Sequence, residues 1–266
     1  MIKLDKPYLD KNPIEKLKIL MSELREKCPW DSVQTHETIA PYTIEEAYEV
    51  SEAIANKDMM SLKEELGDLL FQVIFQSKIA EENEFFNFDD VCETLFTKMV
   101  NRHPHVFDQG RNNSNSELIE NWEKTKENER NKKGYNSLLD DIPIALPELM
   151  RAIKLQKRAA RVNFDWPNID GVLEKIAEES KELSEAIKIK SYDSVKEEMG
   201  DLLFTLVNLS RKLNVDPESA LRETNAKFIK RFSFIESAIN NNGENINFVS
   251  QNKLENLWQA SKTIDV

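Results

Sequence analysis

Cysteine is scarce in this chain of 266 residues, and glycine and basic charge are also in short supply. Cys28 and Cys92 are the only cysteines and lack CxxC spacing, so we expect reduced thiols in a cytoplasmic protein. Six glycines are few for a strand-rich fold, and no stretch alternates apolar and polar residues convincingly. No apolar run approaches membrane-spanning length, and the start of the chain lacks the apolar core of a signal peptide, so we expect no membrane partner.

The shortage of basic charge limits the class of partner. The chain has 36 Lys and Arg against 48 Asp and Glu, and its formal net charge is -12. A nucleic-acid polymer is therefore not the expected partner, and a phosphate ligand would need metal cations between it and the acids. The sequence also lacks a Walker-type glycine-rich loop, which excludes γ-phosphate transfer by that route.

An internal repeat is the most informative feature that is present. The eleven residues from Ser61 to Phe71 return 133 residues later, from Ser194 to Phe204, with nine identities. The same offset carries Glu45-Glu46-x-x-Glu49 onto Glu178-Glu179-x-x-Glu182. We therefore predict two tandem helical modules, residues 1–137 and residues 148–266, joined by a linker at residues 138–147.

The composition, rich in Glu, Lys and Leu, predicts an all-α fold. In the first module we expect a helix from near Ile14, one that starts near Thr43 with Thr43 as its cap, and one that carries Trp122 and Lys126. The remaining expected helices are Met59–Glu82, Phe88–Arg102, Glu148–Ala160, Val172–Ile189, Ser191–Leu213, Pro217–Asn240 and Phe248–Ser261.

The repeated acids suggest a metal site. Glu46 and Glu49 are three residues apart on one helix, and Glu65 and Asp68 are three apart on the next. A short connection makes the two helices antiparallel neighbours, so the four carboxylates would meet and repel one another. Mg²⁺ relieves that repulsion, since it binds carboxylate oxygens, water and phosphates.

The second module offers the same arrangement with Glu179, Glu182, Glu198 and Asp201. Acidic helix faces commonly do no more than face water, and for a single Glu-Glu-x-x-Glu motif that would be the preferred interpretation. Here the acids share their faces with leucines, each pair has a second pair at hairpin distance, and the quartet occurs twice. We therefore favour a functional site.

These motifs resemble those of the MazG family of nucleoside triphosphate pyrophosphohydrolases. The similar stretches are Glu-Glu-x-x-Glu, Glu-x-x-Asp, Cys28-Pro-Trp-Asp31, Gln34-Thr-His36, Arg102-His-Pro-His-Val-Phe107 and Lys157-Arg-Ala-Ala-Arg-Val-Asn-Phe-Asp-Trp166. The resemblance covers nearly the whole chain and implies the two-domain form of the family. It implies an all-α dimer that uses Mg²⁺, with Mn²⁺ as a substitute, to cleave (d)NTPs to (d)NMP and pyrophosphate with broad specificity in nucleotide-pool house-cleaning.

The resemblance also implies roles for individual residues. In the second module, Glu179, Glu182, Glu198 and Asp201 match catalytic metal ligands, and the first quartet matches a second set. The positions that match nucleotide-binding residues, with the lysine that completes the tryptophan motif, are Lys175, Glu197, Lys227, Arg231, Trp258 and Lys262. The position that corresponds to Lys175 in the first module is Tyr42. In the family the second domain is the one expected to carry catalysis.

Several alternatives stay open from the sequence. Lys227 and Arg231 could form a solvated basic face, Trp258 could be a core residue, and Glu178 is a candidate base or supporting group. The competing functions are a regulatory metal- or nucleotide-binding helical protein without turnover, and a divalent-metal buffer. The two modules could also cover each other within one chain, which would give a monomer in place of the dimer.

Overall fold

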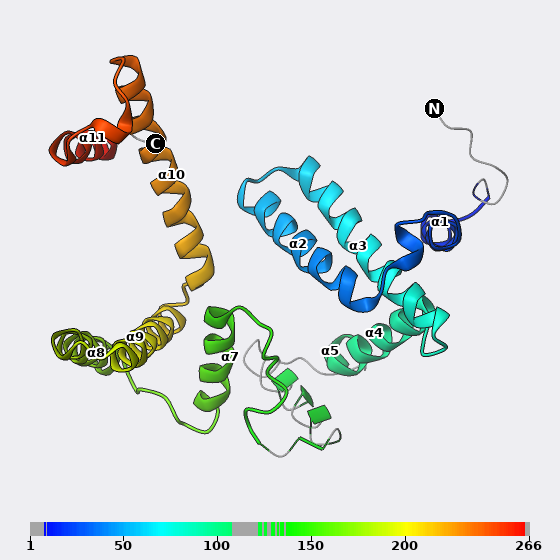
Figure 1. Ribbon diagram of the computed structural model, residues 1–266. Coiled ribbons are helices and arrows are strands. Elements are labelled where there is room, and N and C mark those ends of the chain that lie inside the picture. Colours follow the sequence, from blue (N-terminus) through cyan, green and yellow to red (C-terminus); the bar gives the residue numbers. More distant parts are fainter. Residues whose placement is uncertain are drawn as a thin grey trace. The chain divides into compact units, whose positions relative to one another are not determined.

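The computed structural model is all-α in the part of the chain that it describes, and no strand occurs there (Figure 1). The described residues are 8, 10–107, 122, 123, 125, 126, 129, 130, 132, 134, 135 and 137–263. The chain divides into two compact units, residues 1–126 and 127–266. None of the described helices is both long and apolar enough to cross a membrane.

The first unit is built on an antiparallel hairpin of two long helices (Figure 1). Its elements are α1 (Pro13–Lys27), η2 (Asp31–Val33), α2 (His36–Ala55), α3 (Met59–Glu82), α4 (Phe88–Arg102) and α5 (Pro104–Phe107). Asp58 caps α3 by accepting hydrogen bonds from two backbone amides, so the connection between α2 and α3 is only a few residues long. Helices α1 and α4 both pack on α3.

The core of the first unit lies where α1, α2, α3 and the start of α4 meet. It is formed by six buried side chains, Met21, Ile39, Ile74, Phe75, Ile79 and Phe88. The three of them that belong to α3, Ile74, Phe75 and Ile79, lie in the half of that helix distant from the α2–α3 turn. The other half of α3, which carries the acids, is therefore left exposed or half-buried.

The predicted start of α2 at Thr43 was wrong. The helix begins at His36, because Thr35 and Thr38 form a reciprocal capping box in which each side chain accepts a hydrogen bond from the other's backbone amide. Pro41 lies inside the helix, where it would usually end one. Thr43 is an interior residue, and its hydroxyl donates to the backbone carbonyl of Ile39.

The second unit repeats the hairpin and extends it. Its elements are α7 (Glu148–Ala160), α8 (Ile169–Ile189), α9 (Tyr192–Lys212), α10 (Pro217–Asn241), η3 (Ile246–Phe248) and α11 (Gln251–Thr263). Lys190 ends α8 in the left-handed region at φ 58°, and Ser191 caps α9, so α8 and α9 are antiparallel. Helix α7 packs on α9, and α11 packs on α10 (Figure 1).

The loop between α7 and α8 is fastened to the end of α9 by Asp165. This carboxylate accepts a hydrogen bond from Arg211 at 2.6 Å and one from Lys212 at 2.9 Å, and all three side chains are mostly buried. Burial acts to raise the pKa of Asp165, but the hydrogen bonds from Arg211 and Lys212 outweigh it and hold the pKa below the ordinary value. The loop that precedes α8 is therefore fixed by charge pairing.

The segment predicted as a linker, residues 138–147, forms turns in the second unit. Arg158 of α7 donates to the backbone carbonyls of Leu138 and Asp140 and to the carboxylate of Asp141. The segment is thus tied to α7. The module boundaries at residues 137 and 148 stay a prediction.

Candidate metal and nucleotide site

Three carboxylates meet across each helical hairpin. In the first unit they belong to Glu46, Glu49 and Glu65, and in the second to Glu179, Glu182 and Glu198. Within each group, one oxygen from each residue lies within 4.8 Å of the others. The i, i+3 spacing on the first helix of each hairpin and the antiparallel pairing with the second produce this geometry.

The fourth predicted acid of each quartet lies beside its cluster and outside the 4.8 Å group. Asp68 and Asp201 are both exposed on the next turn of α3 and α9. Their charges still reach the cluster, since Asp68 helps to raise the pKa of Glu46 and Asp201 helps to raise the pKa of Glu198. The structure thus brings three of the four predicted acids into contact in each unit and places the fourth at the edge.

The crowded carboxylates hold protons more tightly than isolated ones. Burial is the largest cause that raises the pKa of Glu198, followed by the charges of Glu182 and Glu179. In the first unit, burial and then the charge of Asp68 raise the pKa of Glu46. Both clusters therefore carry an unfavourable excess of negative charge that a cation would relieve.

Lys175 partly relieves this repulsion in the second unit. Its ammonium group donates to Glu178 at 2.8 Å and lies 2.7 Å from Glu179, and these two contacts raise the pKa of Lys175. Glu179 is only 3% exposed, and its Oε2 atom is buried without a hydrogen-bond partner. A buried carboxylate oxygen without a partner destabilises the folded state unless a bound cation or hydrogen-bond donor contacts it.

The cationic and aromatic residues form a separate group on α10 and α11. The guanidinium of Arg231 lies over the ring of Trp258, 5.7 Å from its centroid, and Phe228 contacts the same ring at 5.5 Å. Trp258 is half-buried, while Lys227, Lys262 and Glu197 are exposed. Figure 1 shows α11 at the far end of α10 from α9, so the described contacts of this group do not reach the acids of the same unit.

The first unit repeats the pairing of arginine with tryptophan. The guanidinium of Arg102 lies over the ring of Trp122 at 5.4 Å, and His103 contacts that ring edge-on at 4.9 Å. Lys126 is paired with Glu123 at 3.6 Å. The Arg–Trp contact is therefore a shared feature of both copies.

Two residues that contact the predicted site residues were not predicted from the sequence. Gln72 of α3 lies against Glu46 in the first cluster, and Phe228 supports Trp258 in the second unit. A glutamine in a helix carries no spacing signal, and Phe228 could have been found only by noticing that it lies next to Lys227 in sequence. The positions Lys98, Arg102, Lys227 and Arg231 did carry a signal, because they repeat in pairs four residues apart.

The donor chemistry fits a hard divalent cation. The three groups that meet in each cluster are carboxylates, and the Oε2 atom of Glu179 is buried without a hydrogen-bond partner. Oxygen ligands of this type select Mg²⁺, Mn²⁺ or Ca²⁺ over softer metals. No described histidine or cysteine belongs to either cluster.

Comparison with known proteins identifies the family of the chain. The model of the MazG nucleotide pyrophosphohydrolase domain matches residues 34–107 and again residues 168–233. The chain is 44% identical over 260 residues to a nucleoside triphosphate pyrophosphohydrolase of Escherichia coli K12, covering 96% of this chain and 99% of the relative. It is 45% identical over 250 residues to the nucleoside triphosphate pyrophosphohydrolase/pyrophosphatase MazG of Thermotoga maritima, with 93% and 95% covered.

Among solved structures, the crystal structure of a mazG-related protein from Thermotoga maritima matches 42% of this chain and 98% of its own, with 26% identity and a TM-score of 0.39. Two copies of the family domain and full-length relatives above 40% identity decide the classification. The chain belongs to the MazG nucleotide pyrophosphohydrolase family.

Proposed function

We propose that this chain hydrolyses (d)NTPs to (d)NMP and pyrophosphate with a divalent metal, at the acidic cluster of the second unit. The observation that carries the proposal is the buried Glu179, whose Oε2 atom is without a partner in a cluster of three carboxylates. The names of the two full-length relatives support the same reaction. Broad specificity and a role in clearing the nucleotide pool fit an aromatic base contact that discriminates weakly between bases.

Glu179, Glu182, Glu198 and Asp201 are the residues that would hold the metal, which we propose is Mg²⁺ with Mn²⁺ as a substitute. When bound, the ion would offset the negative charge of the acids and would supply Lewis-acid stabilisation to the phosphates. Asp201 is exposed on α9 and would have to turn toward the cluster to take part in metal binding.

Lys175 is placed to bind phosphate oxygens. Its flexible stem already reaches the cluster, and its two carboxylate contacts can be exchanged for contacts to the phosphates of the substrate. Glu178 would then be released from Lys175, and its carboxylate would become available to accept a proton from the attacking water. We assign Glu178 as the candidate base on this ground.

Lys227, Arg231 and Trp258 would complete the site from a second copy of the chain. These side chains lie on α10 and α11, and Figure 1 shows α11 at the far end of α10 from α9, which carries Glu198. In a homodimer, Lys227 and Arg231 would neutralise the leaving pyrophosphate and Trp258 would stack on the base. Lys262 and Glu197 would form the border of the same site.

The test is analysis of the phosphorus-containing products from a panel of canonical and damaged dNTPs with Mg²⁺. We expect dNMP and pyrophosphate from the wild type, and no turnover above background from Glu182→Gln. Glu185→Gln, an exposed glutamate one turn later on α8, is the matched control and should keep full activity. Formation of dNDP and orthophosphate would contradict the proposal.

A further inference from the structure

We propose that the second unit binds an internal water molecule between α7 and α9, held by the side chains of Gln156, Asn208 and Arg211. The water would join the two helices next to the loop of residues 161–168, whose sequence motif has no part in the proposed reaction. The proposal rests on buried polar atoms without partners, on the hydrogen bonds that bring them together, and on a charge balance that selects a neutral ligand.

Side-chain atoms on both sides of the α7–α9 contact are buried without a hydrogen-bond partner. They include the amide oxygens Oε1 of Gln156 and Oδ1 of Asn208 and the guanidinium Nε of Arg211. Gln156 is 5% exposed and Asn208 is 3% exposed. A buried polar atom of this kind lowers the stability of the folded state unless a ligand supplies its hydrogen bond.

Hydrogen bonds within the unit bring these side chains to one place. The Nε2 atom of Gln156 donates to the backbone carbonyl of Phe204 at 2.8 Å, and Phe204 lies one helical turn before Asn208 on α9. Asn208 and Arg211 both donate to the Oδ1 atom of Asp165, at 3.5 Å and 2.6 Å. The two amides and the guanidinium therefore converge between α7, α9 and the loop that carries Asp165 (Figure 1).

The same contacts fix which atom of each amide is left unpaired. The carbonyl of Phe204 and the carboxylate of Asp165 can only accept, so each amide directs its nitrogen toward them. The oxygens of Gln156 and Asn208 are thus the atoms that need a donor, whereas the Nε of Arg211 needs an acceptor.

The charges around these atoms select a neutral ligand. Arg211 and Lys212 pair with Asp165 at 2.6 Å and 2.9 Å and together exceed its charge by one positive unit, which disfavours a metal cation. The amide oxygens of Gln156 and Asn208 have no proton to donate, which disfavours an anion. A water molecule can accept from Arg211 and donate to both oxygens, and about three hydrogen bonds are typical of a buried water.

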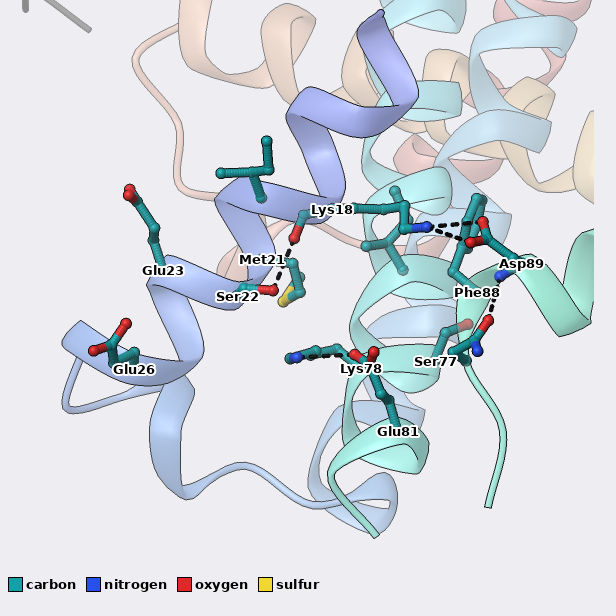
Figure 2. Close-up of a pocket in the computed structure, with 13 residues that line it drawn as sticks. Lys18, Met21, Ser22, Glu23, Glu26, Ser77, Lys78, Glu81, Phe88 and Asp89 are labelled. Atoms are coloured by element: carbon teal, nitrogen blue, oxygen red, sulfur yellow. Dashed lines mark hydrogen bonds and ion pairs between the residues drawn. The ribbon is translucent and has the colours of Figure 1, made fainter. Parts of the chain in front are cut away.

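The first unit has an apolar core at the matching positions. The repeat offset of 133 residues places Asn208 on Phe75 and Lys212 on Ile79, and both of these apolar residues belong to the core of the first unit. Met21 of α1 belongs to the same core, and Figure 2 shows it among the residues that line the pocket beside α3. The hairpin can therefore be packed without polar groups, and their presence in the second unit is explained by a bound ligand.

The test counts internal water molecules per chain by magnetic relaxation dispersion of isotopically labelled water. We expect the wild type to hold one more long-lived water than Asn208→Leu, and one more than Gln156→Leu, because either change removes an acceptor. Leucine has nearly the shape of asparagine, so Asn208→Leu changes hydrogen bonding with little change in volume. Asn225→Leu, the same change at an exposed position of α10, is the matched control and should keep the wild-type count.

A thermal double-mutant cycle gives an independent measurement. Since one water would bridge both side chains, either single change already releases it, and the loss of melting temperature in Gln156→Leu/Asn208→Leu should be smaller than the sum of the two single losses. Equal water counts in the wild type and both buried variants, or additive losses of melting temperature, would overturn the proposal.

Circular dichroism first establishes that each variant keeps its helical content. A variant that does not is replaced by Asn208→Ser or Gln156→Met, for which the same reduced water count is expected. The measurements need no nucleotide, metal or turnover, so failure of the proposed activity would leave their outcome unchanged.

Discussion

One position distinguishes the two carboxylate clusters at the scale of single residues. Lys175 sits within 2.7–2.8 Å of two glutamates, whereas Tyr42 at the same place in the first unit offers a phenol ring and no charge. Helical spacing was sufficient to predict that three acids meet in each hairpin. It could not predict the exposed orientation of Asp68 and Asp201, or the contact of Gln72 with Glu46, because side-chain packing sets both.

The raised pKa of Glu198 predicts a stability that depends on pH in the metal-free protein. A carboxyl whose folded pKa lies above its unfolded value destabilises the folded state once both forms are ionised. This loss of folding stability is absent well below the ordinary glutamate pKa of 4.5. It grows as the pH rises through the raised pKa that Glu198 has in the folded protein. We therefore expect Glu198→Gln to melt at a higher temperature than the wild type at pH 7.5, with the difference vanishing near pH 3.5.

Thermal unfolding in the presence of a chelator measures this difference, with Glu185→Gln as the exposed control. Added Mg²⁺ should make the wild type melt at the higher temperature. The ion would stabilise the wild-type cluster by binding to it, whereas the variant lacks the Glu198 carboxylate as a ligand. A variant that is less stable than the wild type at pH 7.5 without metal would show that the acids do not repel one another.

At the scale of elements, the sequence predicted most helices closely. Met59–Glu82, Phe88–Arg102 and Glu148–Ala160 have the expected ends, since acceptor side chains such as Asp58 and Asn87 mark the first two starts. The start of α2 was misplaced, because Thr43 was predicted as the cap, whereas the capping box of Thr35 and Thr38 starts the helix at His36. The direction of α10 and α11 was beyond prediction, since it depends on packing and not on periodicity.

The loop that precedes α8 gives a prediction at this scale. Asp165→Asn should destabilise the second unit by about 3 kcal/mol, because it leaves Arg211 and Lys212 mostly buried without their counter-charge. Since the pKa of Asp165 is lowered in the folded state, its contribution is fully present above the ordinary value of 3.8 and is lost as the pH falls through the folded value.

Urea unfolding at pH 7 measures the cost of Asp165→Asn. Asp193→Asn, an exposed aspartate in the first turn of α9, is the control and should change the free energy of unfolding by less than about 1 kcal/mol. Equal stability of the two variants would mean that the ion pairs with Asp165 contribute nothing in solution.

At the scale of the whole molecule, the hairpins leave apolar surface uncovered. Leu203, Phe204 and Leu206 of α9 are each more than 40% exposed, on the helix that carries Asp201. Exposed apolar area of this kind on a helical hairpin is typical of a subunit interface.

We therefore expect light scattering to give at least twice the single-chain mass of 30.9 kDa. Leu203→Glu should shift the protein toward the single-chain mass and reduce turnover, since it places a charge in the interface. Ile189→Glu, at the 76% exposed end of α8, should leave the mass unchanged. A wild-type mass near 30.9 kDa would select the alternative in which the two units cover each other.

The two units should contribute unequally to turnover, and Lys175 should account for part of the difference. Both clusters bring three carboxylates together, so metal binding alone does not separate them. A charge-assisted contact to phosphate is typically worth about 1.5–3 kcal/mol, so Lys175→Ala should slow turnover roughly ten- to hundred-fold if the contact acts on the transition state.

Asp201→Asn should abolish activity, and Asp68→Asn, the same change at the matching position of the first unit, should leave most of it. Initial rates of the three variants on one dNTP show which unit carries turnover. If Asp68→Asn were the more damaging of the two aspartate changes, the first unit would be the active one, and the tyrosine at position 42 would have to be compatible with catalysis.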